Sequence, residues 1–413
     1  MAVVPKLPKA VAFGTTEFHV LRSTGAVNPK LLYYFVSSSS VRHEAQHNMT
    51  GAVGQKRVPK RYLETKKFPL PPLSEQNRIV EKIETLFAHI DKGEEALREV
   101  QKLLKRYRQS ILKAAVTGEL TRDWRKANQH NLEPASDLLD RILEIRRESW
   151  KGRGKYKEPT PPELTLYSVL PDSWTLSTTE QLAFVETGAT PKKSESSYYS
   201  AKGTPWITST AVNEDPIQIP QAHITERALK ETNAKVYPAG ALIVAMYGEG
   251  KTRGKVSELG IDSSSNQACA ALLVQHLPSD LARYLKLFYL YNYEAIRRHS
   301  AGGVQPNLNL SIIKDTLIPL PSEAEIGEIL DGVNSELDRI KELELICSNE
   351  LRRSAALRQS ILKSAFTGQL VHQDPNDEPA SELLARIRAE RDAAPAKKRV
   401  KKKPTRRKVR TNA

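Results

Sequence analysis

Side chains able to read DNA bases gather in three glycine-containing stretches between residues 187 and 309 of this 413-residue chain. Lys and Arg suit phosphates and guanine, Asn and Gln suit adenine, and aromatic rings stack on bases. The candidate contacts are Lys192, Lys193, Tyr198, Tyr199, Trp206, Lys251, Thr252, Arg253, Arg298, Gln305 and Asn307. The short stretch TGAVGQKR adds Gln55 and Arg57. Each residue alone is as readily an ordinary surface residue, so the pattern predicts a DNA-binding domain more firmly than it predicts single contacts.

One of these stretches imitates a nucleotide-binding loop. Residues Ala245–Thr252 read AMYGEGKT, the loose form of the phosphate-loop pattern. Such a loop must open a helix whose N-terminal amides hold the phosphates, yet Gly254 follows two residues after Thr252. The segment therefore favours a polar hairpin loop. A nucleotide hydrolase or nuclease stays as a rival class, which requires that Lys251→Ala abolish such an activity. Scattered histidines predict no metal site, and we predict no catalytic residue.

The chain is strongly basic, and much of its charge lies in one short run. The net charge is +15, of which residues 397–410 supply +10, so a polyanionic partner is favoured. We expect residues 396–413 to form a disordered basic tail. A third class of function is therefore a coiled-coil scaffold that binds DNA through this tail alone, without sequence preference.

Cysteine usage and hydropathy indicate the compartment. Two cysteines, Cys269 and Cys347, cannot make a disulfide framework, so a reducing cytoplasm is the expectation. The longest apolar run, Ala241–Met246, is far too short to cross a bilayer. We expect no membrane partner.

One helix ending occurs twice in the chain. RQSILKAAVTGEL at Arg108–Leu120 and RQSILKSAFTGQL at Arg358–Leu370 share ten of thirteen residues. At the same offset of 250 residues, Glu75 is matched by Glu325. A period this long does not describe a solenoid. We interpret it as a duplicated unit of one domain followed by one helix.

Apolar residues before each copy of that ending alternate at spacings of four and three, which is typical of a coiled-coil seam. The predicted seam contains Ile79, Ile83, Leu86, Ile90, Leu97, Val100, Leu104, Tyr107 and Ile111, then Ile329, Val333, Leu337, Ile340, Leu343, Cys347, Leu351, Leu357 and Ile361. Each helix should be on the order of 60 Å long and end near a glycine such as Gly118. The two helices most simply pair with each other; the alternative is that each pairs with another subunit.

The residues between the two helices predict an α+β domain. A connector with a short helix at about Pro134–Glu148 comes first, and from Ser168 to Ile318 short strands alternate with Gly, Pro and Asn turns. TPWITSTAV and GALIVAMYG predict strands. PSDLARYLKLFYLYNYEAIRRHS predicts one long helix. A further helix is predicted near Lys30–Ser37.

The repeated ending, together with the TGATPKK, GKTRGKV and AGGVQPNLNLSII motifs, resembles the specificity subunit of type I restriction–modification enzymes. The resemblance covers nearly the whole chain except the basic tail. It implies an α+β fold with target-recognition domains joined by two family-conserved helices that form an intramolecular antiparallel coiled coil. Each domain would read one half of a two-part site in double-stranded DNA, and the helices would act as a ruler.

The same resemblance implies the partners and places the catalysis on them. Two modification (methyltransferase) subunits would dock on the helices and bind S-adenosylmethionine. Restriction (translocase and nuclease) subunits would use ATP and Mg. This chain would then hold no cofactor and would be a non-catalytic DNA-recognition subunit.

The duplication also predicts domain boundaries. The predicted segments are the C-terminal part of a first recognition domain (1–68), the first helix (69–120), a connector (121–167), the second recognition domain (168–318), the second helix (319–370), a short helical segment (371–395) and the tail (396–413). The offset places the start of the first domain before residue 1, so we expect that domain to be truncated, unless the start is misassigned or another peptide completes it. A non-functional or split specificity fragment is the alternative.

Overall fold

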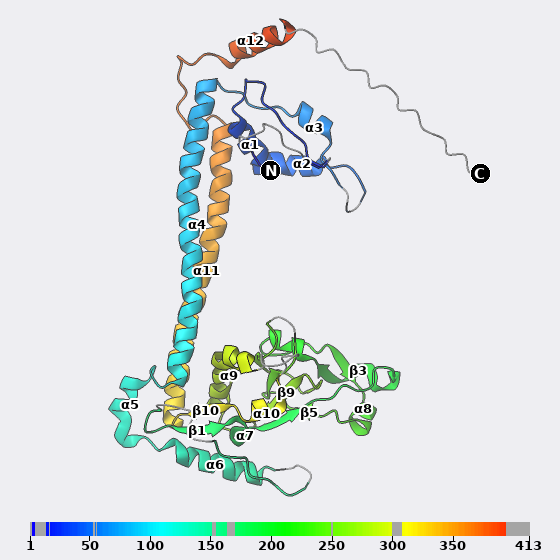
Figure 1. Cartoon of the computed structure of the whole chain (residues 1–413), viewed down its shortest axis with the longest axis vertical. Coiled ribbons are helices and arrows are strands. Elements are labelled where there is room, and N and C mark those ends of the chain that lie inside the picture. Colours follow the sequence, from blue (N-terminus) through cyan, green and yellow to red (C-terminus); the bar gives the residue numbers. More distant parts are fainter. Residues whose placement is uncertain are drawn as a thin grey trace, which may run out of the picture. The chain divides into compact units, whose positions relative to one another are not determined.

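The computed structural model describes residues 2–4, 14–15, 17–52, 54, 56–150, 154–162, 170–248, 251–299 and 308–393, without the side chains of residues 298 and 299. Contacts divide the chain into two compact units. Residues 1–100 and 345–413 form the first unit, and residues 101–344 form the second. Figure 1 labels the elements of both.

Two long helices contribute residues to both units. They are α4 (Leu73–Val116) and α11 (Glu323–Phe366), each of 44 residues. Both end in the same way, with a threonine hydroxyl that donates to the carbonyl four residues earlier, at 2.9 Å in the first copy and 3.0 Å in the second. Gly118 and Gly368 follow at φ +76° and +75°, a left-handed conformation that costs glycine little. The predicted helix end near Gly118 is confirmed.

The two helices run antiparallel, as each unit shows separately. In the second unit, Ile111 near the end of α4 shares a buried cluster with Ile329 near the start of α11. In the first unit, Ile83 near the start of α4 shares a cluster with Ile361 near the end of α11. The predicted intramolecular, antiparallel pairing is therefore confirmed.

The seam is not buried along its whole length. Its buried members are Ile79, Ile83, Leu104, Ile111, Ile329, Val333, Ile340, Cys347 and Ile361, and its half-buried members are Leu86, Ile90, Leu97, Leu337 and Leu351. Val100, Tyr107, Leu343 and Leu357 are 39%, 45%, 45% and 50% exposed, so their prediction as buried seam residues was wrong. A straight α-helix drifts by about 20° per heptad relative to a 3.5-residue repeat, which turns such positions away from a partner helix.

The rest of the first unit combines four shorter helices with irregular segments. Its other helices are α1 (Pro29–Ser37), α2 (Ser39–His47), α3 (Lys60–Thr65) and α12 (Ala380–Ala393). The side chain of Asn28 caps α1 by accepting a hydrogen bond from the Lys30 amide at 2.9 Å. Phe35 of α1 packs edge-on against Phe366 of α11, with 5.2 Å between ring centroids. The helix predicted near Lys30–Ser37 is confirmed.

The second unit combines connector helices with strands. The helical elements are α5 (Arg122–Asn128), η1 (Gln129–Asn131), α6 (Ala135–Glu148), α7 (Thr179–Leu182), η3 (Ser196–Tyr198), η4 (Ser209–Asn213), α8 (Glu226–Glu231), α9 (Ser279–His299) and α10 (Leu310–Lys314). The strands are β1 (Thr175–Thr178), β2 (Phe184–Thr187), β3 (Tyr199–Ile207), β4 (Ala222–Ile224), β5 (Val236–Tyr237), β6 (Leu242–Ala245), β7 (Val256–Glu258), β8 (Ser263–Ser265), β9 (Cys269–Leu273) and β10 (Leu317–Leu320). The α+β class is confirmed.

The strands make three small sheets in orders β1–β10, β2–β9–β6–β7 and β4–β3–β8–β5. Both faces of β6 are buried: Leu242 and Val244 pack in the cluster that includes α9, whereas Ile243 and Ala245 pack in a second cluster. Burial on both faces explains why GALIVAM is a continuous apolar run rather than an alternating one.

Most element predictions between the two helices hold. The predicted short connector helix is α6, and the predicted long helix is α9 with 21 residues. AMYGEGKT follows β6 and leads to β7, which pairs antiparallel with β6, so the predicted hairpin is confirmed and no phosphate-loop helix follows it. In TPWITSTAV the strand ends at Ile207, and a 3-10 helix replaces its second half.

Candidate nucleic-acid interface

The sheet β2–β9–β6–β7 brings two of the predicted loops to one edge. Its neighbouring strands are all antiparallel. The C-terminal ends of β2 and β6 therefore lie beside the N-terminal ends of β9 and β7. The described residues of the connections at this edge, 188–198, 246–248, 251–255 and 266–268, are called the loop edge below.

The first connection is fixed by a close backbone approach. A Cβ on Gly188 would lie 2.0 Å from the Ser265 carbonyl oxygen, so only glycine fits there. The hydroxyl of Thr190 donates to the side-chain oxygen of Gln267 at 2.5 Å. Lys192 and Lys193 follow, and both are exposed. This anchoring holds the two lysines close to the 266–268 connection.

The hairpin between β6 and β7 is fixed against α9. The hydroxyl of Tyr293 donates to the Lys251 carbonyl at 2.6 Å, and Arg297 lies 5.1 Å from the centroid of the Tyr293 ring. Gly254 adopts φ +83°, and a Cβ there would lie 3.2 Å from Cγ of Arg297. Lys251 is exposed. The C-terminal part of α9 therefore supports the hairpin and adds a guanidinium beside it.

The chain also returns toward this hairpin after α9. The amide of Leu308 donates to the Met246 carbonyl at 3.2 Å. Asn309 then caps α10 by accepting a hydrogen bond from the Ile312 amide at 2.8 Å. Of the candidates predicted in this stretch, Gln305 and Asn307 lie outside the described residues, as does the side chain of Arg298.

The described part of the loop edge carries more positive than negative charge. No carboxylate among the described residues comes within ion-pair distance of Lys192, Lys193 or Lys251. The described carboxylate in these loops, Glu195, accepts from the Ser197 hydroxyl, and that hydrogen bond lowers the pKa of the Glu195 carboxyl. An edge with cations of this kind attracts a polyanion.

Three predicted aromatic contacts have roles inside the domain. Trp206 is 6% exposed, packs in a core cluster and donates its indole N–H to the Ala189 carbonyl at 3.1 Å. Tyr199 donates to the Pro191 carbonyl at 2.7 Å and Tyr198 to Glu231 at 3.0 Å. Trp206 was proposed as a DNA contact from its residue type. Its strand was predicted, but the sequence does not show which face of that strand is buried, and burial removes Trp206 from the accessible surface.

The remaining predicted residues are divided between the two units. Thr252 and Arg253 are half-buried within the hairpin. Arg57 lies in the first unit, where it pairs with Glu17 at 2.6 Å and its backbone bridges Thr50. Gln55 lies outside the described residues.

Two polar residues of the loop edge were missed by sequence reasoning. Gln267 is exposed on the 266–268 connection, and Tyr247 is 36% exposed after β6. Each lies one residue from a strand, so its placement depended on strand ends that the sequence defines poorly. The run SSSNQ before β9 contained the signal, since Asn and Gln suit adenine.

Neither a metal-binding group nor an activated thiol is found among the described residues. No group of three or more His, Cys, Asp and Glu side chains among them is arranged to hold a metal ion. Burial raises the pKa of the Cys269 thiol to about 12, so this side chain behaves as a core residue and not as a nucleophile. Within the described ranges no helix combines the length and apolarity that crossing a membrane requires.

Comparisons with known proteins give one consistent result. Residues 7–101 and 171–346 match the family model of the type I restriction modification DNA specificity domain. Over 413 residues the chain is 26% identical to the type I restriction enzyme EcoKI specificity subunit of Escherichia coli (strain K12), covering 96% of this chain and 79% of that protein. It is 26% identical over 372 residues to the EcoBI specificity subunit of Escherichia coli, covering 86% and 70%.

A solved structure has the same fold. It comes from a study of complex assembly and conformational transition of the type I R-M system. The two chains superpose with a TM-score of 0.58 at 17% sequence identity, over 84% of this chain and 73% of that chain.

Proposed function

Because the chain belongs to the type I restriction modification DNA specificity family, we propose that the loop edge of residues 101–344 reads one half of a two-part site in duplex DNA. The chain is a DNA-specificity subunit of a type I restriction–modification system and not a catalytic subunit, as its relatives are named specificity subunits. The loop edge is the part of the described surface best suited to that role.

The convergence of exposed lysines and amides at one sheet edge carries this proposal. Lys192, Lys193 and Lys251 are exposed without a described acidic partner, so they suit phosphate contacts, which position a protein on DNA. Gln267 is exposed on the same edge. Its Oε1 accepts from the Thr190 hydroxyl, and its Nε2 group can donate to a base acceptor such as adenine N7. Phosphate contacts and base contacts thus come from neighbouring connections.

The salt dependence of binding distinguishes residues that contact phosphates from residues that contact bases. Lys192→Ala should weaken binding to all duplexes alike and reduce the slope of log affinity against log salt by about 0.9. Gln267→Ala should cost about 1–3 kcal/mol at one base position and leave the slope unchanged. Lys113→Ala, at an exposed lysine of α4, is the control. Equal effects of Lys192→Ala and Lys113→Ala would remove the loop edge from the interface.

Exposed apolar residues on the long helices supply a docking surface for partner subunits. In the second unit, Leu103, Tyr107 and Leu343 are 51%, 45% and 45% exposed. Leu103 and Tyr107 lie four residues apart on α4 and so on one face of the helix, where adjoining apolar side chains suit a protein–protein contact. We infer that two modification subunits, which carry S-adenosylmethionine, dock on these helices, and that restriction subunits carrying ATP and Mg join the assembly.

Co-purification tests this docking surface. Leu103→Ser should weaken recovery of the modification subunit while changing stability by no more than about 0.5 kcal/mol. The control, Lys105→Ser, changes an exposed neighbour on the same helix. Undiminished recovery with Leu103→Ser would exclude Leu103 from the docking surface.

We further propose that the helices act as a ruler between half-sites. Adding one heptad to both α4 and α11 keeps the seam in register and lengthens them by about 10 Å. The non-specific spacer of the methylated motif should then grow by about 3 base pairs. The same seven residues added near Lys155 are the control. An unchanged spacer in the lengthened-helix variant contradicts the ruler.

Two other functions are less well supported. The nucleotide hydrolase built on AMYGEGKT lacks its helix, because β7 follows the hairpin. The scaffold that binds DNA only through its tail predicts that deletion of residues 396–413 abolishes all binding. We expect sequence preference to survive that deletion, in a protein that acts in the cytoplasm on the DNA found there.

A further inference from the structure

The hairpin between β6 and β7 is supported on two opposite faces. Val256, the first residue of β7, packs in the cluster that includes α9. Ala245, the last residue of β6, packs in the second cluster, which also contains Val212 of η4. The Ala245 amide donates to the Lys255 carbonyl at 2.9 Å, so these two residues lie side by side at the loop edge. The short helix η4 therefore flanks the loop edge on the face opposite α9.

Asn213, at the end of η4, forms a hydrogen-bonded pair with this hairpin. Its Oδ1 accepts from Nζ of Lys255 at 2.7 Å, and its Nδ2 donates to the Thr210 carbonyl at 2.9 Å. An ammonium only donates and a carbonyl only accepts, so the two partners fix which end of the amide is the oxygen. Asn213 is exposed and Lys255 is half-buried, so a ligand can reach the pair.

The backbone that follows Asn213 is fixed to the domain. The Ser257 hydroxyl of β7 donates to the Glu214 carbonyl at 2.6 Å. The Asp215 carboxylate accepts from the Lys286 ammonium of α9 at 2.8 Å. A side chain on a backbone held in this way loses little freedom when it binds a ligand, and such preorganisation favours specific recognition.

The pair presents hydrogen-bond donors to a ligand rather than an acceptor. Hydrogens remain on Nδ2 of Asn213 and on Nζ of Lys255, whereas Oδ1 faces the ammonium. In the major groove guanine offers two acceptors, O6 and N7, while adenine offers an acceptor beside the N6 donor. The N6 amino group of adenine would meet the ammonium as donor against donor. The pair therefore suits guanine and discriminates against adenine.

We propose that Asn213 and Lys255 together read one guanine of the half-site, whose O6 and N7 accept from Nζ and Nδ2. Strand β6 separates β7 from β9, so the connections that carry Lys255 and Gln267 lie about two strand spacings, or ~10 Å, apart. This distance equals about three base-pair steps, so the two amides address different base pairs. The proposal rests on the proposed function, because it names a base that the loop edge reads.

Guanine is favoured over a phosphate, which also offers two acceptor atoms. Glu214 follows Asn213 directly and is exposed. A carboxylate at this position repels a phosphate, whereas it can accept from the N4 amino group of cytosine, the base that pairs with guanine. The pair and its neighbour thus match a G·C pair better than they match the DNA backbone.

Selection from random duplexes tests the pair, with the full-length chain assembled with its modification subunit. Asn213→Ala should lower the preference for guanine at one position of the enriched sequence by at least ~5-fold and leave the other positions unchanged. Lys255→Met keeps a long side chain but removes the ammonium, so the amide regains an acceptor beside its donor. This variant should change the preference at the same position from guanine to adenine, to which asparagine bonds in a bidentate manner.

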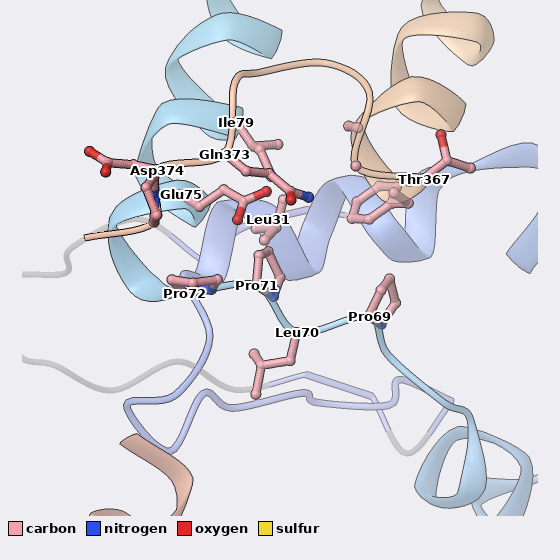
Figure 2. Close-up of a pocket in the computed structure, with 14 residues that line it drawn as sticks. Leu31, Pro69, Leu70, Pro71, Pro72, Glu75, Ile79, Thr367, Gln373 and Asp374 are labelled. Carbon is pink, nitrogen blue, oxygen red and sulfur yellow. The ribbon is translucent and has the colours of Figure 1, made fainter. Parts of the chain in front are cut away.

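A side-chain amide of the first unit supplies the matched control. Gln373 is exposed and lines the pocket at the start of α4, together with Glu75 and Asp374 (Figure 2). No Lys or Arg is among the residues that line this pocket, so it does not suit a polyanion. Gln373→Ala should therefore leave both the enriched sequence and the affinity unchanged.

The outcomes separate this proposal from the function on which it rests. Weaker binding of both variants to all duplexes alike, with an unchanged sequence, would assign the pair to a phosphate and overturn the reading of guanine. An enriched sequence that neither variant alters would overturn the donor pair alone. If the unaltered protein enriches no sequence, both the pair and the proposed function fail.

Discussion

The two copies of the duplicated helix differ most in the surroundings of one glutamate. Glu325 has three hydrogen-bond donors and no exposure, whereas Glu75 is nearly as buried and has none among the described residues. The backbone nearby is the same in both copies, since Gly118 and Gly368 share one left-handed conformation.

This difference shows which features a duplication preserves. Helix length, the threonine hydrogen bond and the glycine stop depend on residues inside the repeat, and all recur. The donors to Glu325 come from outside the two long helices, and one of them, Thr121, is matched by Val371 at the offset of 250 residues. A repeat thus predicts a backbone more reliably than it predicts the side chains that pack on it.

Substituting each glutamate by alanine should give the largest difference in stability loss between the two copies. Glu325→Ala leaves the Trp174 indole and the Arg125 guanidinium without their acceptor, so the local free energy of unfolding should fall by about 3–5 kcal/mol. Glu75→Ala removes a buried charge with no donor, so the loss should stay below ~1 kcal/mol. Hydrogen exchange of the amides beside each site measures both losses. Equal losses would mean that Glu75 has partners as strong as those of Glu325.

Substituting the two stop glycines gives a smaller contrast. Alanine in the left-handed conformation costs about 1–2 kcal/mol at either position. At Gly118 the new Cβ would lie 2.7 Å from Pro171, against 3.3 Å from the flexible Gln373 side chain at Gly368. Gly118→Ala should therefore cost ~1–3 kcal/mol more than Gly368→Ala. Hydrogen exchange of the amides near each helix end measures both losses of stability. A larger loss for Gly368→Ala than for Gly118→Ala would contradict the packing described for Pro171.

The smallest expected effect is a pH dependence in the stability of the second unit. Burial, and then the charge of Arg146, lower the pKa of His276 below its ordinary value. The unfolded chain then binds a proton more readily than the folded chain. The contribution of His276 to stability is therefore full above about pH 6.5 and is lost as the pH falls through the folded pKa.

Hydrogen exchange of residues 101–344 at pH 7 and at pH 5 should show this loss. His276→Gln removes the titrating group, so its stability should depend less on pH over the same interval. A His276→Gln variant with an unchanged pH dependence would show that other groups cause it.

Sequence predicted the long elements well because their signals are local and repeated. The heptad pattern defined α4 and α11, and apolar periodicity defined α9. The same pattern failed at Val100, Tyr107, Leu343 and Leu357, because burial of a heptad position depends on a partner helix that faces it.

The candidate site was harder to predict than the helices. Lys192, Lys193 and Lys251 could be chosen from residue type, and sheet pairing then placed their loops at one edge. Trp206 was proposed as a contact although it faces the core from within β3, because the buried face of a strand depends on packing. Gln267 was missed because it lies between two short strands, β8 and β9, whose ends depend on contacts distant in sequence.

Selection from random duplexes tests most directly whether the loop edge reads DNA. The full-length chain, assembled with its modification subunit at moderate salt, should enrich one defined sequence. The triple variant Lys192→Ala, Lys193→Ala, Lys251→Ala should lose most binding, whereas Lys113→Ala, Lys126→Ala, Lys155→Ala removes the same charge from exposed positions elsewhere and should enrich the same sequence. Gln267→Ala should enrich a sequence relaxed at one position. Failure of the unaltered protein to enrich any sequence, or equal losses in the two triple variants, would contradict the assignment of DNA reading to this edge.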